Sequence, residues 1–84
     1  IMFIELEVKS SITVHGYDND NKEIEEVFEG TDYMKKIIAI NRIQSVSEEY
    51  ILVSSSHGRM MYWNYKGTME ELKQKLLRID VKIA

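Results

Sequence analysis

The side chains best suited to binding or catalysis lie close together in one short stretch, SSSHGR, at 54–59. Hydroxyls, an imidazole and a guanidinium beside a glycine are groups that can bind a small anion such as a nucleotide phosphate. Ser and Gly are also the ordinary residues of a solvent-exposed hairpin turn. The glycine spacing and the lysine of a P-loop are missing. A plain turn and a small-anion site at Ser55, Ser56, His57 and Arg59 are therefore the two interpretations.

Nucleophilic catalysis would need a serine and a histidine within hydrogen-bonding reach of each other. Ser56 and His57 are adjacent, and adjacent residues of a strand point to opposite faces. His15 is the only other histidine, and the chain has no G-x-S-x-G motif. We therefore expect no catalytic residue and no enzymatic activity.

An acidic stretch, DNDNKEIEEVFE, begins at Asp18 and partly resembles a calcium-binding loop. Asp18, Asp20 and Glu29 match its first, third and last ligand positions. Lys22 stands where another ligand is needed, and Glu23 where the loop requires glycine. We therefore expect no metal site and no cofactor. A solvated acidic turn is the simpler interpretation, and a carboxylate strip that occupies a basic surface on a partner is the alternative.

The stretch 60–65, MMYWNY, alternates as a strand with bulky residues on both faces. Such a strand is expected to be covered twice, once by its own core and once by another surface. Tyr, Trp and Met are enriched in interface cores, so Met60, Tyr62 and Trp63 are the predicted protein–protein contact. Stacking on nucleobases is less favoured, because no dense run of Lys and Arg accompanies these rings.

The elements that carry these residues are a hairpin and a helix in the C-terminal part of the chain. Ile51 and Val53 alternate with less apolar neighbours, as in a strand, and the turn that follows ends in Gly58. Thr68 and Glu71 have the spacing of a capping box at the start of a helix. The apolar stripe of this helix comprises Met69, Leu72, Leu76, Leu77 and Ile79.

The N-terminal part predicts strands. Apolar residues alternate from Met2 onward, and we expect one long, bent strand to about Tyr17 with the even-numbered residues inward; a bulge or break at 10–11 is the alternative. Residues 18–21 form a turn. Residues 23–29 fit a short helix or a strand, and pairing with the first strand favours the strand.

Two more short strands, 35–40 and 43–47, precede the hairpin. The whole chain, 1–84, is expected to be a single α+β domain: an antiparallel β-sheet meander of five or six strands with one C-terminal helix packed on it. A small rolled β-barrel plus helix is the alternative. Because Ile1 precedes Met2, we expect Met2 to be the natural start.

The order MFIELEV, KKIIAINRIQSV, YILVSS and GRMMYWNYKGTMEELKQKL resembles the small flagellar-operon FlbD-type proteins and similar short bacterial and phage proteins. The resemblance covers about half of the chain, and the segment from about Lys9 to Tyr33 has no counterpart in it. It implies a small, non-catalytic sheet-plus-helix protein. The matching residues are Ile40, Asn41, Ile43, Gly58, Glu70, Glu71 and Leu76.

Composition narrows the class of partner. The formal net charge of −3 argues against a general nucleic-acid binder. Seven of the 14 acidic residues lie in 18–32 with Lys22 as the only base there, so the rest of the chain is net positive. The absence of cysteine and of a membrane-length apolar run predicts a cytoplasmic protein without membrane contact.

A short chain buries a small core, which favours a homo-oligomer. We expect a non-enzymatic binding or interaction module that self-associates, as a regulatory or accessory protein of a bacterium or mobile element. One alternative is a binding protein for a small anionic ligand, a nucleotide, through the 54–59 loop. A second is a nucleic-acid-associated regulator, and a separate protein partner is also possible.

Overall fold

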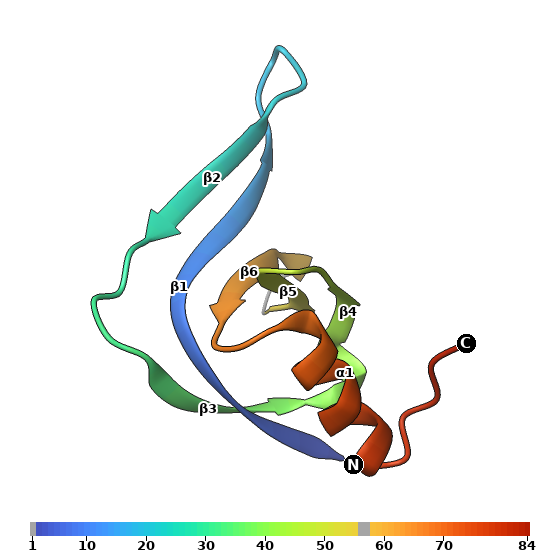
Figure 1. Ribbon diagram of the computed structural model, residues 1–84. Helices are drawn as coiled ribbons and strands as arrows, with labels where there is room; N and C mark the ends of the chain where they lie inside the picture. Colours follow the sequence, from blue (N-terminus) through green and yellow to red (C-terminus); the bar gives the residue numbers. More distant parts are fainter. Residues whose placement is uncertain (1, 56–57) are drawn as a thin grey trace.

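The computed structural model describes residues 2–55 and 58–84, which form an open antiparallel sheet of six strands with one C-terminal α-helix (Figure 1). The predicted α+β architecture is confirmed, and the sheet does not close into the alternative rolled barrel. The described residues contain no helix of the length and apolar character needed to cross a bilayer. The elements are β1 (Phe3–Tyr17), β2 (Glu23–Phe28), β3 (Met34–Ala39), the 3-10 helix η1 (Ile40–Arg42), β4 (Ile43–Val46), β5 (Tyr50–Ser54), β6 (Met60–Tyr65) and α1 (Met69–Arg78).

The long first strand is the centre of the sheet. The strand order is β2-β1-β6-β5-β4, and β3 also pairs with β1. Residues 3–8 of β1 pair with β3, and residues from Ser11 onward pair with β2. The segment from Val8 to Val14 pairs with β6 on the other edge. One strand therefore organises three others, as Figure 1 shows.

A bulge divides β1 into two halves. The strand is continuous, as predicted, and its register with β6 shifts between Val8 and Ser11, at the place where a bulge was the alternative prediction. An extra residue on one strand reverses which side chains point inward. Ser11 is therefore buried, opposite Trp63, while Ile12 and Val14 lie on the other face. The expectation that the even-numbered residues stay inward throughout β1 was wrong for this reason.

The core lies on one face of the sheet, here called the inner face. Leu72 and Leu76 of α1 pack on it, so the helix covers this face. Thr68 and Glu71 form the predicted capping box, with the Glu71 N–H donating to Thr68 Oγ1 at 3.1 Å. The predicted helical stripe was too wide, because Met69 and Leu77 are exposed. The buried core residues are Ile4, Leu6, Val8, Ile38, Ile51, Val53, Tyr65, Leu72 and Leu76.

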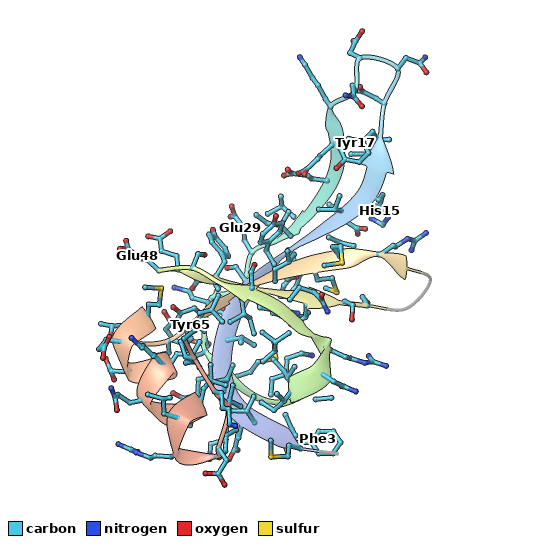
Figure 2. All side chains as sticks on the ribbon, turned by 90° about the vertical axis from the view of Figure 1, so that its right-hand side faces the viewer. Phe3, His15, Tyr17, Glu29, Glu48 and Tyr65 are labelled. Carbon is cyan, nitrogen blue, oxygen red and sulfur yellow. The ribbon has the colours of Figure 1, made fainter. Side chains whose placement is uncertain are left out.

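The outer half of β1 and its partner β2 project from the rest of the molecule as a two-stranded ribbon, here called the arm (residues 12–28; Figures 1 and 2). The strand predicted at 23–29 is confirmed, and all six residues of β2 are exposed. The turn at its tip is closed by Asp18, whose Oδ1 accepts from the backbone N–H groups of Asp20 and Lys22. The remaining described residues, with most of the sheet and α1, are here called the body.

A glycine stands where the arm leaves the body. A Cβ atom on Gly30 would lie 2.1 Å from the carbonyl oxygen of Lys9, in the bulge of β1. The Gly30 N–H donates to Ser10 Oγ at 3.4 Å. This close approach of two backbone segments is possible only without a side chain at this position.

Candidate functional site

An apolar row crosses the face of the sheet opposite the core, here called the outer face. Leu52 of β5 is paired with Tyr62 of β6, and Tyr62 is paired with Ile12 of β1. Ile12 is in turn paired with Val27 of β2. Residues paired directly across antiparallel strands share a face, so the four side chains form a continuous line from the body into the arm.

A second row beside it extends this surface. Met60 is paired with Val14, and Val14 with Glu25 at the edge of the sheet. The ring of Tyr62 meets that of Tyr50 edge to face, with centroids 6.3 Å apart. Since α1 packs on the inner face, it leaves this side of the sheet uncovered. We call the surface the outer patch; it consists of Ile12, Val14, Val27, Leu52, Met60 and Tyr62.

The structure separates the predicted interface residues. Met60 and Tyr62 belong to the outer patch, and both are half-buried. Trp63 lies on the inner face, where it packs against the core. The alternation of the strand predicted this difference, but no local pattern indicated that Ile12 and Val27 continue the row. Their place depends on the bulge in β1 and on its pairing with β2.

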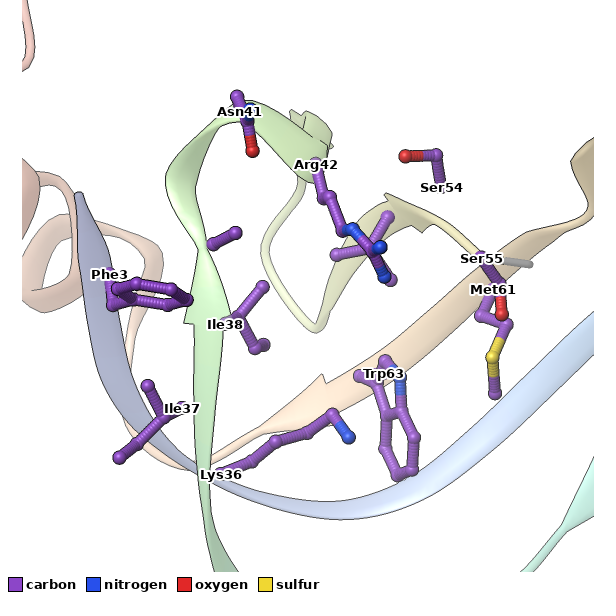
Figure 3. A pocket seen from close by; sticks show the side chains of 12 residues that line it. Phe3, Lys36, Ile37, Ile38, Asn41, Arg42, Ser54, Ser55, Met61 and Trp63 are labelled. Carbon is purple, nitrogen blue, oxygen red and sulfur yellow. The ribbon is translucent and has the colours of Figure 1, made fainter. Parts of the chain in front are cut away.

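A hollow of about 480 Å³ lies between β3 and the β5–β6 hairpin (Figure 3). Trp63 and Lys36 meet in it, with the Lys36 ammonium 4.6 Å from the centroid of the indole. At this distance the ammonium and the ring attract each other through a cation–π interaction. Figure 3 shows Arg42 reaching into the same hollow from η1. Its lining residues are Phe3, Lys36, Ile37, Ile38, Ala39, Asn41, Arg42, Val53, Ser54, Ser55, Met61 and Trp63.

Only part of the predicted anion site lies at this hollow. Ser55 lines it, and the Ser55 N–H donates to the carbonyl oxygen of Arg59 at 2.7 Å. Arg59 is exposed and does not line the hollow. Ser56 and His57 lie outside the described residues.

The basic side chains of the hollow were not assigned to a site from the sequence. Lys36 alternates with Ile38 in β3, and this spacing places both on the inner face. The spacing therefore indicated an inward lysine, but it gave no sign that Trp63 of a distant strand lies beside it. Arg42 comes from the 3-10 helix that follows β3, where the sequence predicted only a break.

Tyr65 is the buried polar side chain that fixes the hairpin to the preceding turn. Its hydroxyl donates to the backbone carbonyl oxygens of Ser47 and Glu48. Burial raises the pKa of the Tyr65 phenol above its usual 10.0, and the negative charge of Glu48 raises it further. The ring of Tyr65 lies in the core and its hydroxyl bonds to two backbone carbonyls, which indicates that this side chain stabilises the fold.

The acidic turn and the imidazole of the arm are separate from the hollow. His15 Nε2 and Glu26 Oε2 are 2.9 Å apart on the surface of the arm. Within 2–55 and 58–84, no three His, Asp or Glu side chains are grouped so that they would hold a metal ion. The acidic turn and His15 therefore contribute no side chain to the hollow.

No protein-family model, curated protein or solved structure matches the chain. The resemblance to the FlbD-type proteins stays a prediction.

Proposed function

We propose that this protein is a non-enzymatic interaction module that self-associates through the outer patch. The observation that carries the proposal is the in-register apolar row Leu52–Tyr62–Ile12–Val27, which no helix covers. Apolar residues in line across four adjacent strands form a flat surface of the kind that buries well against another sheet. Tyr62 at its middle is a residue type enriched at the energetic centres of interfaces.

A second copy of the chain is the partner that we propose, because the outer patch can cover the same patch of another molecule. The row runs from Leu52 in the body to Val27 in the arm, and a two-fold axis that crosses its centre at right angles sets each arm against the other body. A contact of this kind buries the same apolar surface on both copies, so no second, complementary surface is needed.

The two copies are expected to meet through the outer faces of their sheets and not through the edge strands. The free edge of the sheet at β2 carries Glu23, Glu25 and Glu26, all exposed. Pairing this strand with its own copy would bring like charges together across the new ladder. Charged side chains on an edge strand are a common protection against edge-to-edge association. The outer face has no such protection at Val27.

The proposal is tested by light scattering over a concentration series, with two variants. Val27→Lys places a charge in the outer patch at a position that is 56% exposed, so the fold is expected to tolerate it. Ile37→Lys is the matched control, an equally large change at an exposed apolar residue of β3 outside the patch. We expect a dimer for the wild type and the control, and for Val27→Lys a dissociation constant larger by about tenfold or more.

Two outcomes contradict the proposal. One is a wild-type monomer at high micromolar concentration. The other is a dimer that Ile37→Lys weakens as much as Val27→Lys does, because this would place the contact elsewhere or make it non-specific.

A further inference from the structure

We propose that the hollow between β3 and the β5–β6 hairpin binds a nucleotide, that is, a small ligand with a planar ring and a phosphate. The hollow is lined by inner-face residues such as Trp63 and Met61, whereas the outer patch is formed by their neighbours on β6. The two sites therefore lie on opposite sides of the same strand, and each can be tested without the other.

The charge of the hollow selects an anion. Lys36 and Arg42 line it, and none of its twelve lining residues is acidic. Within residues 2–55 and 58–84, the ion pairs are His15–Glu26 and Lys66–Glu7, so neither cation of the hollow is paired with a carboxylate. Two cations free of carboxylates in a chain of net charge −3 form a local positive field that attracts anions.

The side chains around these cations fit the other parts of a nucleotide. Figure 3 shows Arg42 entering from η1 while Lys36 extends from β3 toward the indole of Trp63. The guanidinium of Arg42 is suited to bidentate contact with a phosphate. The partly exposed indole offers a surface for stacking of a planar ring. Asn41, Ser54 and Ser55 supply amide and hydroxyl groups for the edge of a base or for a sugar.

The size of the hollow and the charge around it favour a single nucleotide over a nucleic-acid strand. A volume of about 480 Å³ lies within the range typical of small-molecule sites. A strand would continue beyond the hollow and would need a track of basic residues along its backbone. The acidic segment 18–32 of the same small domain would instead repel such a polyanion.

The single tryptophan of the chain makes the test direct, because all indole fluorescence comes from Trp63. Adenosine, guanosine, cytidine and uridine monophosphates are titrated into the wild-type protein, with calorimetry as a second readout. We expect a saturable change in emission with at least one of the four. The matching nucleoside and inorganic phosphate, each lacking one half of the ligand, are expected to bind about tenfold more weakly or worse, as for a lost charged or stacked contact.

Three substitutions distinguish a specific binding site from attraction by the net charge of the protein. Arg42→Gln and Lys36→Gln are expected to weaken binding about tenfold or more, because each removes a charge-assisted contact. Lys73→Gln is the control: it removes the same charge from an exposed residue of α1 that does not line the hollow. Binding by Lys73→Gln should equal that of the wild type. Circular dichroism checks that all three variants are folded.

Four results would overturn the proposal. The first is the absence of any fluorescence or calorimetric response to all four monophosphates at millimolar concentration. The second is an equal loss in Lys73→Gln and Arg42→Gln, which would indicate attraction by net charge. The third is inorganic phosphate binding as tightly as the nucleotide. The fourth is a short single-stranded oligonucleotide that binds more tightly than every mononucleotide, which would assign the hollow to nucleic acid.

Discussion

The inner half of β1, before the bulge, is buried at Ile4, Leu6 and Val8. Beyond the bulge, the outer half of β1 pairs with β2, and all six residues of β2 are exposed. Both halves are hydrogen-bonded to neighbours on both edges over part of their length, so pairing alone does not explain the difference. What differs is the layer on the inner face, since Leu72 and Leu76 of α1 pack against the core of the body. A two-stranded ribbon without such a layer is only marginally stable.

The largest effect on stability is expected when a buried side chain in the inner half of β1 is shortened. Leu6→Ala should lower the free energy of unfolding by about 3 kcal/mol, because it leaves a cavity beneath the helix. Ile24→Ala in the arm, where the side chain is 46% exposed, should change it by about 0.5 kcal/mol or less. Urea unfolding measures both. Similar losses for the two variants would mean that the face of the arm opposite the outer patch, where Ile24 lies, is also packed against something in solution.

The next largest effect is expected at the joint between the two regions. Gly30→Ala should cost about 2 kcal/mol, because its Cβ would collide with the carbonyl oxygen of Lys9. Thr31→Ala, at the exposed neighbouring position, is the control and should be nearly neutral. Hydrogen exchange of the two variants shows where the damage lies. Full stability of Gly30→Ala would contradict the close crossing at the bulge.

A pH-dependent effect is expected in the body. Since the pKa of Tyr65 is higher in the folded than in the unfolded protein, its contribution to stability is complete below the unfolded value of about 10. This contribution is lost as the pH rises from there through the folded pKa. Tyr65→Phe should lower stability at neutral pH by about 1 kcal/mol and make the alkaline decline shallower. Tyr17→Phe, at an exposed site in the arm, is the control and should change the stability at neutral pH by about 0.5 kcal/mol or less; an equal loss in both variants would contradict the structural role of the Tyr65 hydroxyl.

The smallest effect is expected for the contact between His15 and Glu26 on the arm. Glu26→Gln removes the charge that faces His15, and exposed pairs of this kind contribute about 0.5 kcal/mol or less. Chemical denaturation should therefore show almost no change in midpoint. A larger loss would mean that the arm is held by its surface contacts to a degree that its exposure does not suggest.

Local signals in the sequence were enough to predict the elements of this fold. The capping box of Thr68 and Glu71 and the alternation from Met2 to Val8 each depend on residues close in the chain. The sequence left a bulge at 10–11 as an alternative only, because Ser10 and Ser11 fit a regular strand equally well until the pairing with β6 fixes the register. The faces of Ile12 and Val14 were assigned wrongly for that reason.

Residues of the candidate sites were predicted only where the pattern of a single strand was enough to show which face they occupy. The two-faced pattern of β6 identified Met60 and Tyr62 as residues of a second surface. The hollow required three segments far apart in the chain, which bring Lys36, Arg42 and Trp63 together. No local pattern relates these residues, and of the two predicted ligand residues of the serine-rich loop that the structure describes, Ser55 lines the hollow and Arg59 does not.

The central place of β1 in the sheet delays folding while the chain is being synthesised on the ribosome. The first strand to be synthesised contacts β6, with Val8 next to Tyr65, so its second edge stays open until almost the whole chain has emerged. Contacts of such long sequence separation slow folding, and unpaired strand edges in incomplete chains promote aggregation. Translation must therefore be nearly finished before the sheet can close around its first strand. Nascent chains that stop before residue 65 are expected to depend on chaperones to remain soluble.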